Sequence, residues 1–327
     1  QKLFKLGGVT PIILIVFFNA FLDLGHKILI QTTVFKVYDG REQIILTAIV
    51  NGLILLPFVL LFTPAGLLSD RHRKPRIMRY SAAVAVSLTL LITASYYAGW
   101  FWFSFAMTFL LAVQSAIYSP AKYGFIKELA GKGQLATANA IVQATTIVAI
   151  LLGIFVFSIF FERQLVGVSY TDKAEVLQAI APVGWLLVAC AAWEFWLTSR
   201  LPLGEVGTAE RGFDWRHYGT GRYLHANLAK ILANRTIWLS IVGLSVFWGI
   251  SQVVLAAFPA FAKEALGETN TVVIQGLLAC SGAGVIVGSL LAGSASRDYI
   301  ETGLVPLGAL GVVLAMFFIP QLSSSVA

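Results

Sequence analysis

The stretch from Pro11 to Val34 reads PIILIVFFNAFLDLGHKILIQTTV. It is long enough to cross a bilayer, which takes about 20 predominantly apolar residues. Because residues three and four apart share one face of a helix, its polar side chains form a single stripe. A charge at this depth costs about 2.5–3.5 kcal/mol to insert and is tolerated where it faces a bundle interior or a watery cavity. The stripe predicts a transport pathway, and its members are Asn19, Asp23, His26 and Lys27.

The composition of the whole chain is that of an integral membrane protein. Of its 327 residues, 58% are hydrophobic and 12% are charged, against about 45–50% and about 25% in soluble domains. Cys190 and Cys280 lie in separate apolar segments without the spacing of metal ligands, so we expect no metal or cofactor. No nucleophile–base arrangement or phosphate-binding loop is visible, and we therefore do not expect an enzyme.

Apolar runs predict an all-α membrane protein with nine spans. A long polar segment separates the first six spans from the last three. We expect an N-terminal six-span bundle at 1–198, a cytoplasmic linker with an amphipathic helix at 199–236, and a partial C-terminal bundle at 237–327. If the second half mirrors the first, twelve spans are expected in all. The predicted spans are about residues 10–34, 44–63, 77–97, 101–120, 137–160, 178–198, 237–261, 272–294 and 303–320.

The distribution of positive charge predicts how the chain crosses the membrane. Most of the 23 Lys and Arg residues fall in segments that face the cytoplasm if the N-terminus is cytoplasmic, among them the cluster from Arg71 to Arg79. Cytoplasmic loops carry such an excess in membrane proteins. The net charge of +7 is thereby explained without a nucleic-acid partner, and we expect none.

The loop between the second and third spans, at residues 66–76, reads GLLSDRHRKPR. It resembles the signature loop of the major facilitator superfamily, G-x-L-x-D-R-x-G-R-K-x, with an arginine in place of the second glycine. We expect Gly66 to allow two helices to approach closely, and Asp70 to meet a helix N-terminus. Arg71 and Lys74 are expected to pair with acids of neighbouring helices or with lipid phosphates. The resemblance implies a gate between two bundles that rock to alternate access to a site near the midplane.

A narrower resemblance lies in the fourth, fifth and seventh spans. Residues 118–124 read YSPAKYG, residues 138–153 read ANAIVQATTIVAILLG, and residues 245–249 read SVFWG. They are similar to the bacterial lysophospholipid transporter family. This resemblance implies a transporter that flips lysophospholipids, chiefly lysophosphatidylethanolamine, from the outer to the inner leaflet of a bacterial inner membrane. It also implies a fused or partner acyltransferase/acyl-ACP synthetase that re-acylates the lipid.

The chemistry of such a substrate suits the polar stripe. A zwitterionic headgroup needs an anion and a cation in a low-dielectric cavity, where charge-assisted hydrogen bonds are strongest. We expect Asp23 to take the ammonium and Lys27 the phosphate, with His26 and Asn19 beside them. Further candidates for the cavity wall are Gln143, Trp248 and Gln252. The residues expected to guide the headgroup at the cytoplasmic end of the fourth span are Tyr118, Lys122 and Tyr123.

Other interpretations of the same residues stay open. A proton-coupled exporter of drugs or metabolites would use Asp23 and His26 as its titrating pair. Many such antiporters carry a G-P-x-x-G-G element in the fifth span, where this chain has only Gly153. A membrane anchor for a fused acyltransferase would leave the intramembrane charges without a purpose. Finally, Asp23 and Lys27 can form a purely structural ion pair.

Overall fold

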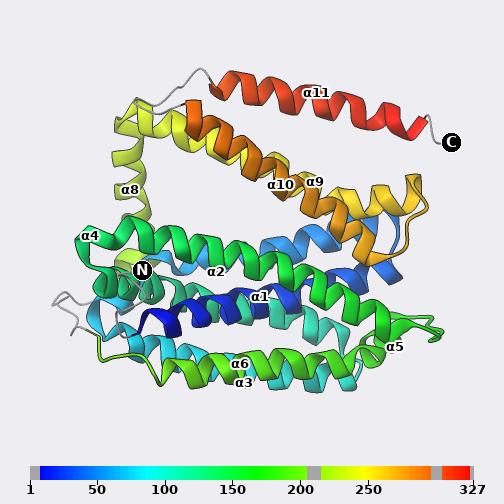
Figure 1. Cartoon of the computed structure of the whole chain (residues 1–327), viewed down its shortest axis with the longest axis horizontal. Helices are drawn as coiled ribbons and strands as arrows, with labels where there is room; N and C mark the ends of the chain where they lie inside the picture. Colours follow the sequence, from blue (N-terminus) through cyan, green and yellow to red (C-terminus); the bar gives the residue numbers. More distant parts are fainter. Residues whose placement is uncertain (1–7, 205–214, 296–303, 325–327) are drawn as a thin grey trace. The chain divides into compact units, whose positions relative to one another are not determined.

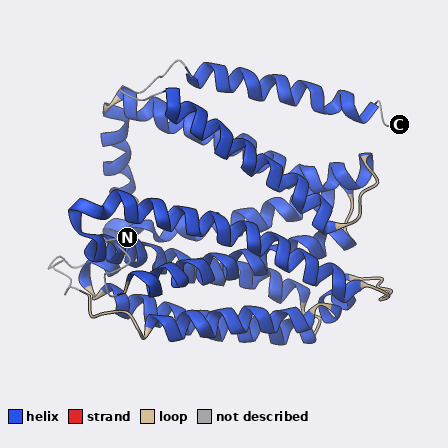
Figure 2. Ribbon diagram, viewed as in Figure 1, coloured by secondary structure: helices blue, strands red, loops and turns tan. Residues whose placement is uncertain are grey.

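The computed structural model of the chain describes residues 8–204, 215–295 and 304–324, and within these ranges the only regular secondary structure is helix (Figure 2). The chain divides into two compact units, residues 1–256 and 257–327. In the described residues, seven helical segments are long and apolar enough to cross a membrane. The predicted all-α membrane fold is therefore confirmed.

The membrane helices follow the predicted spans closely. The sixth span begins later than predicted, because Pro182 lies in a short 3-10 turn, Ala181–Val183, that precedes the last helix of the first bundle. The helices of the first unit are α1 (Val9–Val37), α2 (Gly40–Arg71), α3 (Lys74–Tyr97), α4 (Phe101–Leu165), α5 (Lys173–Ala179), α6 (Gly184–Thr198), α7 (Trp215–Gly219) and α8 (Arg222–Ala233). Helix α9 (Arg235–Ala265) runs across the boundary between the units, and the second unit contains α10 (Thr271–Ala295) and α11 (Leu304–Ser324).

Helix α4 contains two of the predicted spans. They join at Gly131, whose φ of 62° and ψ of 178° break the helix in a conformation that glycine adopts readily. The fourth span was predicted to end at residue 120, and this was too early. The helix continues past Pro120 because Ala121, Phe125 and Ile126 are still buried against the bundle. As a result, Lys122 lies within the fourth membrane helix.

Helix α1 lies at the centre of the first unit. It packs against α2, α4 and α6, while α3 packs against α4 and α6 (Figure 1). Leu22 and Ile30 of α1, Tyr96 of α3, and Phe157 and Phe161 of α4 are completely buried in the core. A central helix can carry a polar stripe through a membrane because its neighbours shield it from lipid.

The predicted linker contains a helix, α8, with apolar side chains at the spacing of one face. Residues 205–214 of this linker lie outside the described residues. The predicted domain boundaries, and the position of α8 on the membrane surface, stay predictions.

The contact between α1 and α4 depends on a glycine. A Cβ atom added at Gly25 would lie 2.3 Å from the ring of Phe157, which is completely buried. At Gly153, on α4, an added Cβ would have its nearest neighbour at 3.5 Å, an ordinary contact. The two positions therefore differ in how they tolerate a methyl group.

We expect Gly25→Ala to destabilise the first bundle. Overpacking a filled core costs about 1–3 kcal/mol, so the thermal unfolding temperature of the purified protein in detergent should fall by several degrees. Gly153→Ala is the matched control and should unfold close to the parent. Equal unfolding temperatures for the two variants would show that α1 and α4 are not packed as described.

Candidate functional site

Polar side chains of α1, α4 and α6 meet inside the first unit. The Ser115 hydroxyl donates a hydrogen bond of 2.5 Å to Oδ2 of Asp23. The other carboxylate oxygen of Asp23 is buried and has no hydrogen-bond partner in the described part of the chain. The Lys122 ammonium attracts the carboxylates of both Asp23 and Glu194. We call this group the buried polar cluster; its members are Asn19, Asp23, Ser115, Tyr118, Lys122 and Glu194.

Glu194 of α6 is the most deeply buried acid of the cluster, with no exposed surface. The Asn19 amide and the Tyr118 hydroxyl lie beside its carboxylate. Neither forms a well-oriented bond: among the described residues, Asn19 Nδ2, Tyr118 Oη and both Glu194 oxygens lack a partner. An unpaired buried polar group costs about 1–3 kcal/mol, and a charged one more. Such a concentration of unpaired atoms indicates a site that a polar ligand or water completes.

The cluster offers charges of both signs. Two carboxylates, of Asp23 and Glu194, attract one ammonium, of Lys122. The Lys122 Nζ atom also lies 5.6 Å from the ring centre of Tyr118 and 5.1 Å from that of Tyr123, within the range of cation–π attraction. Tyr123 itself is 40% exposed. This arrangement is chemically suited to a ligand that carries a cation and an anion close together.

Two members of the cluster, Glu194 and Ser115, were missed in the sequence analysis. The signal for Glu194 was present, because it is an acid within the apolar span predicted at 178–198. Intramembrane acids are functional candidates by default, and the reasoning that selected Asp23 applies equally to it. Ser115 had no such signal, since serine is common in membrane helices and only the fold brings it to Asp23.

His26 occupies a different environment from Asp23. Its Nδ1 atom lies 2.7 Å from the Tyr96 hydroxyl, and its Nε2 atom lies 3.2 Å from the Thr108 hydroxyl. Both ring nitrogens are thus occupied by side chains of α3 and α4, and the ring is completely buried. The geometry supports a structural role for His26, as a link between three helices.

We expect His26→Gln to lower stability without changing the coupling of transport to protons. Tyr96 and Thr108 lie at the two nitrogens of the His26 ring. A glutamine side chain cannot reach both hydroxyls, so at least one buried hydrogen bond is lost. The unfolding temperature should fall, while transport by the folded fraction keeps the pH dependence of the parent. A changed pH profile at unchanged stability would instead support the titrating pair of the exporter interpretation.

Lys27 does not form an ion pair with Asp23. In the described part of the chain, the ion pairs are Lys36–Glu162 and Lys74–Glu128. The side chain of Lys27 is partly buried. A structural Asp23–Lys27 pair is therefore not found, and the role of Lys27 as a phosphate ligand stays a prediction.

The remaining wall candidates are not joined to the cluster by any hydrogen bond, ion pair or ring contact of the described residues. Gln143 is exposed on α4, and on α9 Gln252 is partly buried and Trp248 is 54% exposed. Their roles stay predictions.

The signature loop makes its close contact at an unexpected position. A Cβ added at Gly66 would meet no atom within 4 Å, whereas one at Gly124 would lie 2.5 Å from Cε of Lys74. Lys74 crosses Gly124 and forms an ion pair with Glu128 on α4. A close approach is thus made at Gly124, where the start of α3 meets α4, and the role expected of Gly66 stays a prediction. The other two motif residues, Asp70 and Arg71, are exposed.

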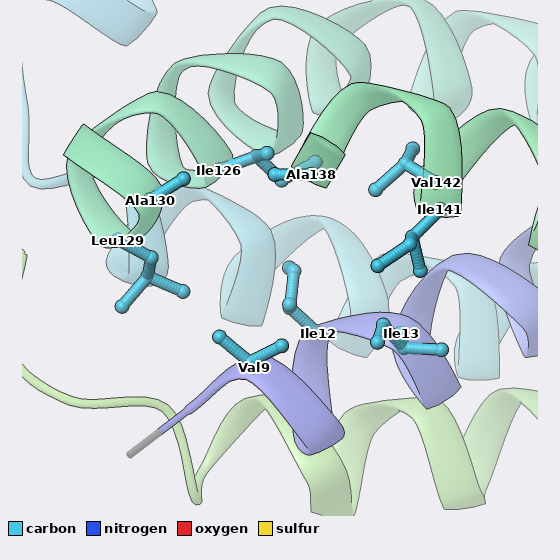
Figure 3. Close-up of a pocket in the computed structure, with 9 residues that line it drawn as sticks. All are labelled: Val9, Ile12, Ile13, Ile126, Leu129, Ala130, Ala138, Ile141 and Val142. Atoms are coloured by element: carbon cyan, nitrogen blue, oxygen red, sulfur yellow. The ribbon is translucent and has the colours of Figure 1, made fainter. Parts of the chain in front are cut away.

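An apolar hollow between α1 and α4 does not compete with the cluster as a site. Its volume is about 20 Å³, and its walls are aliphatic side chains on both sides of the break in α4 (Figure 3). Such a space holds about one water molecule by size but offers it no polar partner. The lining residues are Val9, Ile12, Ile13, Ile126, Leu129, Ala130, Ala138, Ile141 and Val142.

Together these features define a multi-pass helical membrane protein whose first bundle encloses a charged polar cluster. The family model described as "Major Facilitator Superfamily" matches residues 12–327. The chain therefore belongs to this superfamily, and it is a transporter by family membership. The prediction made from the signature loop is confirmed.

Several similar curated proteins carry the name "Lysophospholipid transporter LplT". The protein of Citrobacter koseri is 28% identical over 317 residues, which cover 95% of this chain and 72% of the relative. Those of Salmonella gallinarum and Salmonella newport are each 27% identical over 317 residues, with 95% of this chain and 71% of the relative covered. The narrower resemblance expected from the sequence is thus borne out by relatives along nearly the whole chain.

Proposed function

We propose that the protein flips lysophospholipids, chiefly lysophosphatidylethanolamine, from the outer to the inner leaflet of a bacterial inner membrane. One observation carries the proposal: the buried polar cluster holds unpaired carboxylate oxygens and an ammonium that attracts them. A zwitterionic phosphoethanolamine headgroup complements both signs. The relatives named as lysophospholipid transporters add support.

Within this proposal, the two acids share the cationic end of the headgroup. Asp23 Oδ1 and the Glu194 carboxylate have unused acceptor capacity, so they take the ammonium through charge-assisted hydrogen bonds. Lys122 is the cation that these two acids attract, and it binds the phosphate of the headgroup. This modifies the assignment expected from the sequence, in which Lys27 had that role and Lys122 stood at the exit.

Binding requires the cluster to open, because most of its polar atoms are inaccessible in this structure. Rocking of two bundles about a central site is the way transporters of repeated architecture open to each side in turn. Gln143, Trp248 and Gln252 complete the wall of the cavity, and the loop with Gly66, Asp70, Arg71 and Lys74 forms the gate. The acyl chain stays in contact with apolar walls or lipid.

The proposed direction, from the outer to the inner leaflet, delivers the lysolipid to the cytoplasmic side, where the positive-inside rule places the N-terminus. An acyltransferase, fused or separate, is the class of enzyme that consumes it there by restoring the second acyl chain.

The proposal is tested by reconstitution in liposomes with lysophosphatidylethanolamine that carries a fluorescent acyl chain. A membrane-impermeant quencher reports the fraction in the outer leaflet, and we expect the protein to exchange the lipid between leaflets faster than protein-free liposomes do. Absence of exchange, combined with efflux of small cations driven by a proton gradient, would support the exporter instead. Absence of both activities would support the membrane anchor.

A further inference from the structure

A second polar hollow lies between the start of α3 and the end of α6, and its volume is about 510 Å³. We propose that it binds the phosphate-bearing headgroup of an anionic phospholipid, as a resident lipid and not as the transported substrate. The residues that carry the argument are Arg73, Arg76 and Arg79 of the α3 end, and Phe195, Thr198 and Ser199 of the α6 end.

The charge of the hollow favours an anion. Three guanidinium groups line it, and no acidic side chain is among the described residues that form its wall. The nearby acid Glu128 lies beside Gly204 but forms an ion pair with Lys74. Arginine presents a planar set of donors that matches a phosphate in two-point contact. A headgroup phosphate would neutralise charge that the described residues of the wall leave uncompensated.

The hollow is also partly preorganised. The guanidinium carbon of Arg79 lies 5.8 Å from the ring centre of Phe195, within the range of cation–π attraction. The hydroxyls of Thr198 and Ser199 donate to backbone carbonyls of α6, which fixes their orientation in the wall of the hollow. The volume falls within the range of about 300–1,000 Å³ that small-molecule sites occupy.

The surroundings indicate a lipid and not a free phosphate ion. Tyr80 lines the hollow and is 67% exposed, and α3 continues from it with Val84, 50% exposed, and Leu91, 49% exposed. These three positions share one outward face of the helix, because they are four and then seven residues apart. An acyl chain can lie along this apolar stripe while Tyr80 sits at the headgroup level, where tyrosine is enriched in membrane proteins.

The leaflet follows from the orientation that the Lys and Arg distribution predicts. The hollow is at the end of α3 next to the signature loop, which the positive-inside rule assigns to the cytoplasm. Basic pockets between membrane helices on that side suit anionic lipid headgroups. The resident lipid would join α3 to α6 at this end.

The test is native mass spectrometry of the purified protein in detergent, titrated with phosphatidylglycerol or with phosphatidylcholine of the same acyl chains. We expect one phosphatidylglycerol to be retained preferentially. The double variant Arg76→Gln/Arg79→Gln should bind it at least about tenfold more weakly, since each lost charge-assisted contact is worth about that factor. The matched control is Arg41→Gln/Arg163→Gln, which removes two exposed arginines predicted to lie on the outer side and should bind like the parent.

Three results would overturn the proposal. Equal retention of the two lipids would show no selection for an anion. Equal loss of phosphatidylglycerol from the test and control variants would show that binding depends on the net charge of the protein and not on the arginines of the hollow. Complete displacement of the lipid by millimolar inorganic phosphate would identify a free phosphate site. Thermal unfolding of both double variants in the same detergent verifies that the comparison is made on folded protein.

Discussion

Asp23→Asn should reduce lysophosphatidylethanolamine flipping by a factor of about 10 to 100 while the protein stays folded. The substitution keeps the size of the side chain and an acceptor for Ser115, but it removes the negative charge offered to the substrate ammonium. Hydrogen bonds to charged groups contribute about 1.5–3 kcal/mol, which corresponds to this range. The initial rate of leaflet exchange in liposomes measures the effect.

Glu264→Gln is the matched control for Asp23→Asn. It makes the same chemical change at an exposed residue near the end of α9, so its flipping rate should equal that of the parent. If Asp23→Asn flips the lipid at the rate of this control, the carboxylate of Asp23 takes no part in substrate binding.

Lys122→Gln should have an effect of similar size, whereas Lys27→Gln should retain most of the activity. Lys122 attracts both carboxylates of the buried polar cluster, and without it two acids remain with no cation beside them. Removing one partner of a buried charge group costs about 3–5 kcal/mol in stability. The unfolding temperature is therefore measured alongside the flipping rate, so that a loss of folded protein is not mistaken for a loss of transport. Lys122→Arg keeps the charge and should restore folding and part of the transport.

The opposite ranking of the two variants in flipping activity would assign the substrate phosphate to Lys27. If Lys27→Gln loses flipping at normal stability and Lys122→Gln keeps it, the assignment expected from the sequence is right and the one drawn from the cluster is wrong. Measuring both variants in one preparation of liposomes makes the comparison independent of reconstitution yield.

The fold was readable from local features of the sequence. Long apolar runs identify membrane helices because every backbone group in lipid must be satisfied within the segment. The loop at 66–76 identifies the superfamily because its glycine, acid and basic residues are adjacent in sequence. The ends of the helices were predicted less accurately: the fourth span was predicted to end at residue 120, but burial of Phe125 and Ile126 keeps the helix intact beyond it.

The membership of the candidate site depended on contacts between helices. Asp23 was identified from its depth in one apolar run, yet its partners Ser115, Lys122 and Glu194 lie on two other helices. His26 is one turn from Asp23 in sequence, but its ring bonds to α3 and α4 instead. Spacing along one helix predicts a shared face; it does not predict which neighbouring side chain each residue of that face meets.

Equilibrium binding of lysophosphatidylethanolamine to the purified protein, followed by calorimetry, tests most directly whether the buried polar cluster is the headgroup site. The double variant Asp23→Asn/Glu194→Gln is compared with Glu264→Gln, and circular dichroism confirms helical content in both. We predict saturable binding to the parent and to Glu264→Gln, and binding at least about tenfold weaker for the double variant. Binding of equal strength to all three proteins would contradict the assignment of the headgroup to this cluster.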